Sequence, residues 1–195
     1  MLARGQCIEH YGTGEAYLPV LEALGQLCRG GEGEQIIGVL RQYAPTWLVQ
    51  MPALLTDAEM EAIQRKVQGA TRERMLRELA EALEVLTSEM PLVLVLEDLH
   101  WSDYSTLDLI PYLARRRGPA RLLVLGSYRP AEVIASGHSL LSLTQELHAH
   151  QQCADLALRL LSAGEVGQYL TARFDTMPSS NPQSPIRNRL PPSTP

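Results

Sequence analysis

Three charged residues follow apolar runs in this 195-residue sequence, where their side chains can do chemistry. Glu97 and Asp98 come directly after the apolar run 92–96, and Arg129 follows the run 121–126, RLLVLG. In open α/β sheets, ligands bind outside the carboxyl ends of the strands. Two adjacent carboxylates at such an end suggest a divalent metal ion and a water molecule. A guanidinium at the same edge suits a phosphate oxygen.

The apolar runs predict two parallel strands. Residues 92–96 are bounded by Pro91 and by the two acids, as expected for a strand buried on both faces. Ser102 or Asp103 can cap a helix that continues through Arg117 and stops at the Gly-Pro pair that follows. A strand, helix and strand of this length form a right-handed parallel crossover, which places Arg129 at the same sheet edge as the acids.

The stretch LVLVLEDLHWSD resembles the Walker B strand of P-loop ATPases, specifically of AAA-like and STAND-type regulatory ATPases. The resemblance implies that Glu97 holds Mg²⁺ on the ATP phosphates and that Asp98 orients or activates the attacking water. Arg129 matches the sensor-1 position, which implies contact with a phosphate. The family more usually has Asp first, so Glu97 is a departure. The plainer alternatives are a solvated acidic turn and an arginine that pairs with these acids or with solvent.

The segment before this strand also resembles the family. LARGQCIEHYGTGEAYLPVLEAL is similar to the part that follows the Walker A helix: a second strand, predicted at 2–8 and interrupted by Gly5, a turn-rich loop at 10–15, and a helix opening near Pro19. Short helices follow to residue 68, one started by the capping box of Thr56 and Glu59. A longer helix is predicted at 71–88. Its solvated face carries six charged residues: Arg72, Glu73, Arg74, Arg77, Glu78 and Glu81.

The last third of the chain predicts a helix at 138–150, a final strand at 156–160 and a helix ending at Phe174. Ser162 and Glu165 form a second capping box at the start of that last helix. From Pro178 onward the composition predicts a disordered proline-rich tail. The expected organisation is therefore a partial AAA-like ATPase domain over 1–174 and a tail over 175–195.

The sequence contains no G-x-x-x-x-G-K-[ST] motif, whose amides, lysine and hydroxyl bind phosphates and Mg²⁺. Lys66 is the only lysine, and it lies in IQRKVQGA. We expect the first strand and the P-loop to lie upstream of Met1. The predicted fold class is α/β, a partial three-layer P-loop NTPase fold with a mainly parallel sheet that lacks its first strand and P-loop. The edge of strand 121–126 would then be an exposed apolar pairing surface.

Composition and net charge narrow the classes of function and cellular location that remain. The net charge is −5 and predicts no direct nucleic-acid contact, and the basic cluster 115–117 lies where it complements a helix dipole. No apolar run is long enough to span a membrane, and no leader opens the chain, so a cytoplasmic location is expected. Three widely spaced cysteines indicate reduced thiols. The motif HxHxxC at 148–153 has no fourth ligand nearby and is a poor metal site.

Together these features predict a fragment of an ATP-binding regulatory ATPase, which uses ATP and Mg²⁺ in the parent family. Without the phosphate-binding loop we expect no competent hydrolysis by this chain alone. A non-enzymatic interaction module is the alternative, pairing with an intact homologous ATPase or with itself. A product without a role is a third possibility.

Overall fold

The computed structural model describes residues 1–9, 15–116 and 118–174. The chain divides into two compact units, Met1–Ala154 and Asp155–Pro195. The expected turn at 10–14 and the tail from Pro178 lie outside the described residues. The first unit contains β1 (Leu2–Gln6), α1 (Leu18–Cys28), α2 (Gly33–Tyr43), α3 (Pro45–Leu48), η1 (Pro52–Leu54), α4 (Asp57–Val67), α5 (Arg72–Glu89), β2 (Leu92–Glu97), η2 (Leu99–Trp101), α6 (Tyr104–Arg115), β3 (Leu122–Gly126), α7 (Pro130–Ser136) and α8 (Leu140–Ala149). The second unit contains α9 (Ala163–Phe174).

The strands form a three-stranded parallel sheet in the order β1-β2-β3. In its register Leu94 lies opposite Ala3 on one side and Val124 on the other. The predicted partial α/β fold with a parallel sheet is confirmed. β1 runs straight through Gly5, so the predicted interruption there is wrong.

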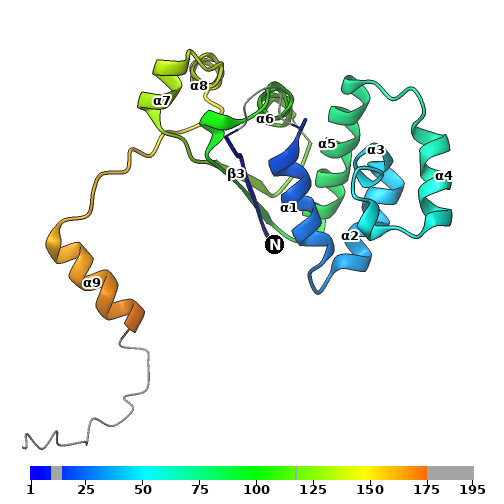
Figure 1. The fold of residues 1–195 in the computed structure, drawn as a ribbon, viewed down its shortest axis with the longest axis horizontal. Helices are drawn as coiled ribbons and strands as arrows, with labels where there is room; N and C mark the ends of the chain where they lie inside the picture. Colours follow the sequence, from blue (N-terminus) through cyan, green and yellow to red (C-terminus); the bar gives the residue numbers. More distant parts are fainter. Residues whose placement is uncertain (10–14, 117, 175–195) are drawn as a thin grey trace, which may run out of the picture. The chain divides into compact units, whose positions relative to one another are not determined.

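The crossover helices α1, α5 and α6 lie on one face of this sheet. α1 packs on β1 and β2, and α1 and α5 both contact α6 (Figure 1). Both crossovers step the same way across the sheet, so a common right hand places their helices on the same face. Leu92, Leu94 and Leu96 point to that face and are buried.

The opposite face of the sheet is left partly open. Val93 and Val95 are half-buried, and on β3 Leu123 and Leu125 are 53% and 47% exposed. The prediction that the run 92–96 is buried on both faces is therefore wrong. The reason is topological, because both crossovers place their helices on the other face, and no described strand pairs with the free edge of β3.

Amphipathic helices supply the rest of the core. One apolar face of α1 and one of α5 are buried, and the fully buried Trp47 of α3 donates from its indole nitrogen to the Met75 carbonyl oxygen at 2.8 Å. The capping box of Thr56 and Glu59 starts α4 as predicted. None of the described helices is long and apolar enough to cross a membrane.

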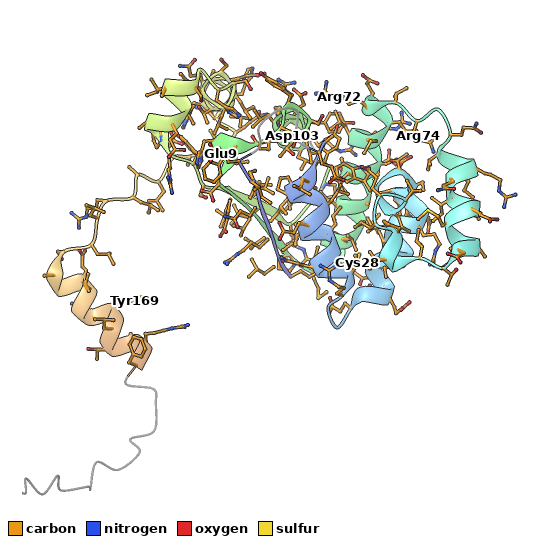
Figure 2. The ribbon with its side chains drawn as sticks, viewed as in Figure 1. Glu9, Cys28, Arg72, Arg74, Asp103 and Tyr169 are labelled. Atoms are coloured by element: carbon orange, nitrogen blue, oxygen red, sulfur yellow. The ribbon has the colours of Figure 1, made fainter. Side chains whose placement is uncertain are left out.

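One residue of the face predicted to be solvated is buried instead. Arg72 and Arg74 extend from the first turn of α5 (Figure 2), and Arg74 Nε lies 2.7 Å from Glu78 Oε1. The second carboxylate oxygen of Glu78 accepts hydrogen bonds from the backbone amide and the hydroxyl of Thr46. Glu78 is only 6% exposed because α3 covers this turn of α5. Charge alone could not predict that contact.

The second unit differs from the expectation in one element. Residues 156–160 form no strand, and Leu156, Leu158 and Leu160 are each at least 85% exposed. A strand needs a neighbour to pair its backbone groups, and this segment has none among the described strands. α9 forms as predicted, and Ser162 and Glu165 make the reciprocal hydrogen bonds of its capping box.

Candidate functional site

The two acids lie at the carboxyl end of the central strand. β2 ends at Glu97, and Asp98 takes a left-handed conformation (φ 58°, ψ 43°) that turns the chain into η2. Neighbouring strands hold this turn on both sides. The Cys7 amide donates to the Glu97 carbonyl oxygen at 2.9 Å, and the Leu99 amide donates to the Ser127 carbonyl oxygen at 2.8 Å. Hydrogen bonds on both sides therefore fix the backbone around the acids.

The side chain of Glu97 belongs to the open face of the sheet, because it shares the strand parity of Val93 and Val95. Arg4 Nε lies 3.6 Å from Glu97 Oε1. The Asp98 carboxylate accepts a hydrogen bond from Gln6 Nε2 at 2.9 Å, and its amide donates to Ser127 Oγ at 3.1 Å. Both acids thus meet polar groups from β1, and Glu97 keeps about a third of its side chain exposed.

Arg129 lies just before α7, after β3 has ended beside β2. Its Nη1 lies 2.8 Å from Glu132 Oε1. That hydrogen bond raises the pKa of the guanidinium above its usual value, and the charge of Asp98 makes a smaller contribution in the same direction. Arg129 therefore forms its ion pair with Glu132, in the first turn of α7.

The chemistry open to this edge follows from its donors. Carboxylate oxygens suit Mg²⁺, which proteins commonly bind through one or two carboxylates together with water and substrate phosphates. The described residues contain no group of three or more histidine, cysteine, aspartate and glutamate side chains able to hold a metal ion by themselves. Glu97 and Asp98 fit a metal ion that phosphates help to bind, and they do not form a closed protein cage.

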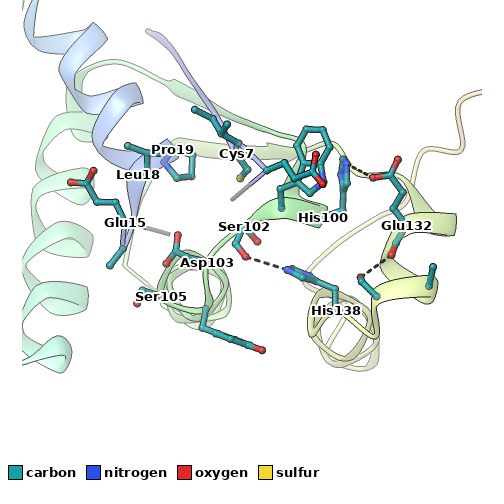
Figure 3. A pocket seen from close by; sticks show the side chains of 17 residues that line it. Cys7, Glu15, Leu18, Pro19, His100, Ser102, Asp103, Ser105, Glu132 and His138 are labelled. Carbon is teal, nitrogen blue, oxygen red and sulfur yellow. Dashed lines mark hydrogen bonds and ion pairs between the residues drawn. The ribbon is translucent and has the colours of Figure 1, made fainter. Parts of the chain in front are cut away.

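A pocket of about 810 Å³ lies beside this edge, between β1, α1, η2, α6 and α7. Figure 3 shows Glu15 and Asp103 on one side and His100 and Glu132 on the other. Sequence reasoning did not find this pocket. His100 and Asp103 lie within the quoted strand motif, but Cys7, Glu15 and Glu132 come from distant segments that only the tertiary structure brings together.

Comparison with known proteins gives one match. A family described as AAA ATPase domain matches residues 1–125. This range contains all three strands except the last residue of β3. No curated protein and no solved structure shows significant similarity to the chain.

Proposed function

Since the chain belongs to the AAA ATPase domain family, we propose that its first unit forms part of a site for ATP and Mg²⁺. In this proposal Glu97 is the Walker B acid that contacts the metal ion and Asp98 positions the water. Arg129 is the sensor-1 residue that contacts a phosphate. The observation that carries the proposal is the position of Glu97 and Asp98 at the carboxyl end of the central parallel strand.

Local geometry supports these roles. The Glu97 side chain lies on the open face of the sheet, where the crossover helices do not obstruct a ligand. The hydrogen bonds of Asp98 to Gln6 and Ser127 hold it next to Glu97, and the ion pair of Arg129 with the half-exposed Glu132 can be exchanged for a phosphate. When bound, Mg²⁺ would neutralise charge on the phosphates.

The chain alone should not hydrolyse ATP. Phosphate binding in P-loop enzymes depends on a glycine-rich loop, a lysine and a helix N-terminus acting together, and the sequence has no such motif. We propose that the two acids and Arg129 are the remainder of a regulatory ATPase site of the STAND type. Its phosphate-binding part would have to come from elsewhere.

Calorimetric titration of the purified chain with ATP and Mg²⁺ tests this proposal. The Glu97→Gln variant removes the proposed metal ligand, and Glu89→Gln on α5 is the charge-matched control. We expect binding weaker than about 100 μM, equivalent to about −5.5 kcal/mol, and no phosphate release. Tighter binding or phosphate release that Glu97→Gln abolishes would contradict the claim that the chain is inactive alone. Binding that is equal in all three proteins would contradict the role of Glu97.

A second candidate function is pairing with a homologous ATPase chain. The observation that favours it is the free edge of β3 together with the exposed Leu123 and Leu125 on the open face. An unpaired apolar strand edge is a template for another strand. A chain that carries a P-loop strand and the helix after it would supply both a strand for this edge and a cover for this face.

Light scattering during gel filtration tests the pairing, using the chain mixed with an ATPase domain that contains a P-loop. We expect a complex that Leu125→Lys weakens by at least about tenfold, because a charge would be buried in the contact. Exposed Leu141 on α8 offers the matched control, Leu141→Lys. A complex that loses equal affinity in both variants, or no complex at all, would rule out pairing through β3.

A further inference from the structure

Glu132 contacts two different groups through its two carboxylate oxygens. Oε1 accepts a hydrogen bond from Arg129 Nη1 at 2.8 Å, and Oε2 lies 3.1 Å from His100 Nε2, a contact that Figure 3 shows. Arg129 follows β3, whereas His100 lies in η2, directly after the acids at the end of β2. Glu132 in the first turn of α7 therefore joins the segments that follow two neighbouring strands.

The two partners of Glu132 differ in their freedom to move. The His100 side chain is fully buried, and its ring packs against Trp101 with the ring centroids 4.5 Å apart. Its Nε2 lies at a hydrogen-bond distance from Glu132 but without hydrogen-bond geometry, so this contact is electrostatic. The Arg129 side chain is 65% exposed, and among the described residues its ion pair is with Glu132. The histidine is therefore fixed by packing and the arginine is not.

α7 is also held at its other end. His138, just past the end of α7, accepts from the Leu140 amide at Nδ1, at 3.3 Å. An Nδ1 that accepts leaves the ring proton on Nε2, which donates to the Ser102 carbonyl oxygen at 3.1 Å (Figure 3). Both ends of α7 thus contact the segment after the acids. The Glu132 carboxylate therefore stays in place when the side chain of Arg129 moves.

A phosphate that binds Arg129 has to replace this carboxylate. Carboxylate and phosphate oxygens both accept from the N–H groups of a guanidinium, so they compete for it. The carboxylate is part of the chain and is always next to Arg129, which makes it a competitor at high effective concentration. Arg129 and Glu132 are 65% and 41% exposed, so solvent screens their ion pair and leaves it weak enough for an anion to displace.

We infer that Glu132 is a positioning residue that competes with phosphate for Arg129 and thereby limits anion binding at this edge of the sheet. His100 is its second anchor, because the carboxylate keeps its contact with Nε2 when the guanidinium leaves. This inference rests on the proposed phosphate contact of Arg129. It goes further by giving Glu132 and His100, which have no proposed contact with the nucleotide, control over the affinity.

Titration with tripolyphosphate and Mg²⁺, followed by NMR at the backbone amides of residues 126–129, measures this competition. Glu132→Gln keeps the shape of the side chain and removes its charge, so we expect binding to tighten by at least about threefold. Glu146→Gln is the matched control, because Glu146 forms a similar half-exposed ion pair with Arg115, between α8 and α6. At about 0.15 M salt it should change the affinity by less than about 1.5-fold.

The same comparison in an Arg129→Gln background shows whether Glu132 acts through the arginine. There, Glu132→Gln should change the affinity by less than about 1.5-fold, because the group for which it competes is absent. Equal tightening in both backgrounds would overturn the inference, since it would show a general effect of charge. Unchanged affinity in Glu132→Gln, together with weaker binding in Arg129→Gln, would overturn the inference and leave the proposed function intact. If Arg129→Gln binds as tightly as the wild type, the proposed phosphate contact fails, and the inference fails with it.

The imidazole nitrogen signals of His100 test the second anchor. When tripolyphosphate displaces Arg129, the Glu132 charge remains next to Nε2 without its guanidinium, so the Nε2 signal should shift during the titration. The shift should be absent in Glu132→Gln, a difference that a purely structural role of Glu132 would not produce. An Nε2 signal that stays constant while the wild type binds tripolyphosphate would rule out His100 as the anchor.

Discussion

A Cβ atom added to Gly5 would lie 1.7 Å from the backbone carbonyl oxygen of Pro19. β1 and the first turn of α1 therefore approach each other so closely that only glycine fits between them. This contact places α1 over the sheet and brings Pro19 and Leu18 to the wall of the acidic pocket. The glycine is required for helix packing and does not interrupt the strand.

Gly5→Ala should consequently destabilise the protein. The added methyl meets backbone atoms that cannot rotate away, so we expect the free energy of unfolding to fall by about 2–3 kcal/mol. Urea denaturation followed by circular dichroism measures the change. Gly38→Ala in α2 is the matched control, because its added methyl meets nothing within 4 Å and should stabilise the helix by up to about 1 kcal/mol. Equal stability of Gly5→Ala and the wild type would refute the close approach.

Glu78→Gln tests the buried carboxylate on α5. A glutamine amide cannot accept from both the Thr46 amide and Arg74 Nε, so buried donors lose their acceptor. We expect a loss of about 2–3 kcal/mol in the free energy of unfolding. Glu81→Gln on the same helix removes a half-exposed carboxylate 3.9 Å from Arg77 and should cost less than about 0.5 kcal/mol. Similar losses in both variants would mean that Glu78 is solvated after all.

Glu59 gives a pH-dependent test of the capping box. Hydrogen bonds from the backbone amide and the hydroxyl of Thr56 lower the pKa of Glu59 below its ordinary value of 4.5, and Arg41 adds to the effect. A depressed pKa stabilises the fold above the unfolded pKa, and this contribution is lost as the pH falls through the folded value. NMR titration should show that Thr56→Ala raises the pKa of Glu59. Hydrogen bonds from Ser162 lower the pKa of Glu165 in the same way, and that pKa should stay unchanged in the Thr56→Ala variant. An unchanged Glu59 pKa would argue against the capping box.

The three thiols should differ in reactivity. Burial raises the pKa of Cys7 to about 12 and that of Cys28 to about 11, so both remain protonated at pH 8. Cys153 is half-buried at the end of the first unit. Because the thiolate is the nucleophile, iodoacetamide at pH 8 should label Cys153 first, as peptide mass spectrometry would show. The Cys153→Ser variant should lack this fast labelling by iodoacetamide. Rapid labelling of Cys7 would instead indicate that α1 opens away from β1.

Much of the local structure could be predicted from the sequence. The helix opening near Pro19 and the longer helix at 71–88 form as α1 and α5, and the side chains of Thr56 and Ser162 marked where two other helices begin, because these signals act within a few residues of one another. The run 92–96 indicated the central strand, and the motif around Glu97 indicated the AAA ATPase family that the comparison shows. The roles of Glu97, Asp98 and Arg129 stay predictions.

Features that depend on distant segments were beyond sequence reasoning. The run 92–96 was predicted to be buried on both faces, yet both crossovers place their helices on one face, which leaves Val93 and Val95 half-buried and Leu123 and Leu125 of β3 exposed. The alternating leucines of 156–160 resemble a strand, but a strand exists only where a neighbour pairs its backbone.

The sequence by itself thus determined the three paired strands, most of the helices and the family, since helix caps and apolar periods are encoded in neighbouring residues. Only the tertiary structure decided which charges are buried, which face of the sheet is open and which acids meet around the pocket. Glu78 is buried because α3 folds over it, and Glu15 and Glu132 line one pocket because the segment before α1 and the first turn of α7 both border it. Both depend on packing between segments far apart in the chain, which no local pattern records.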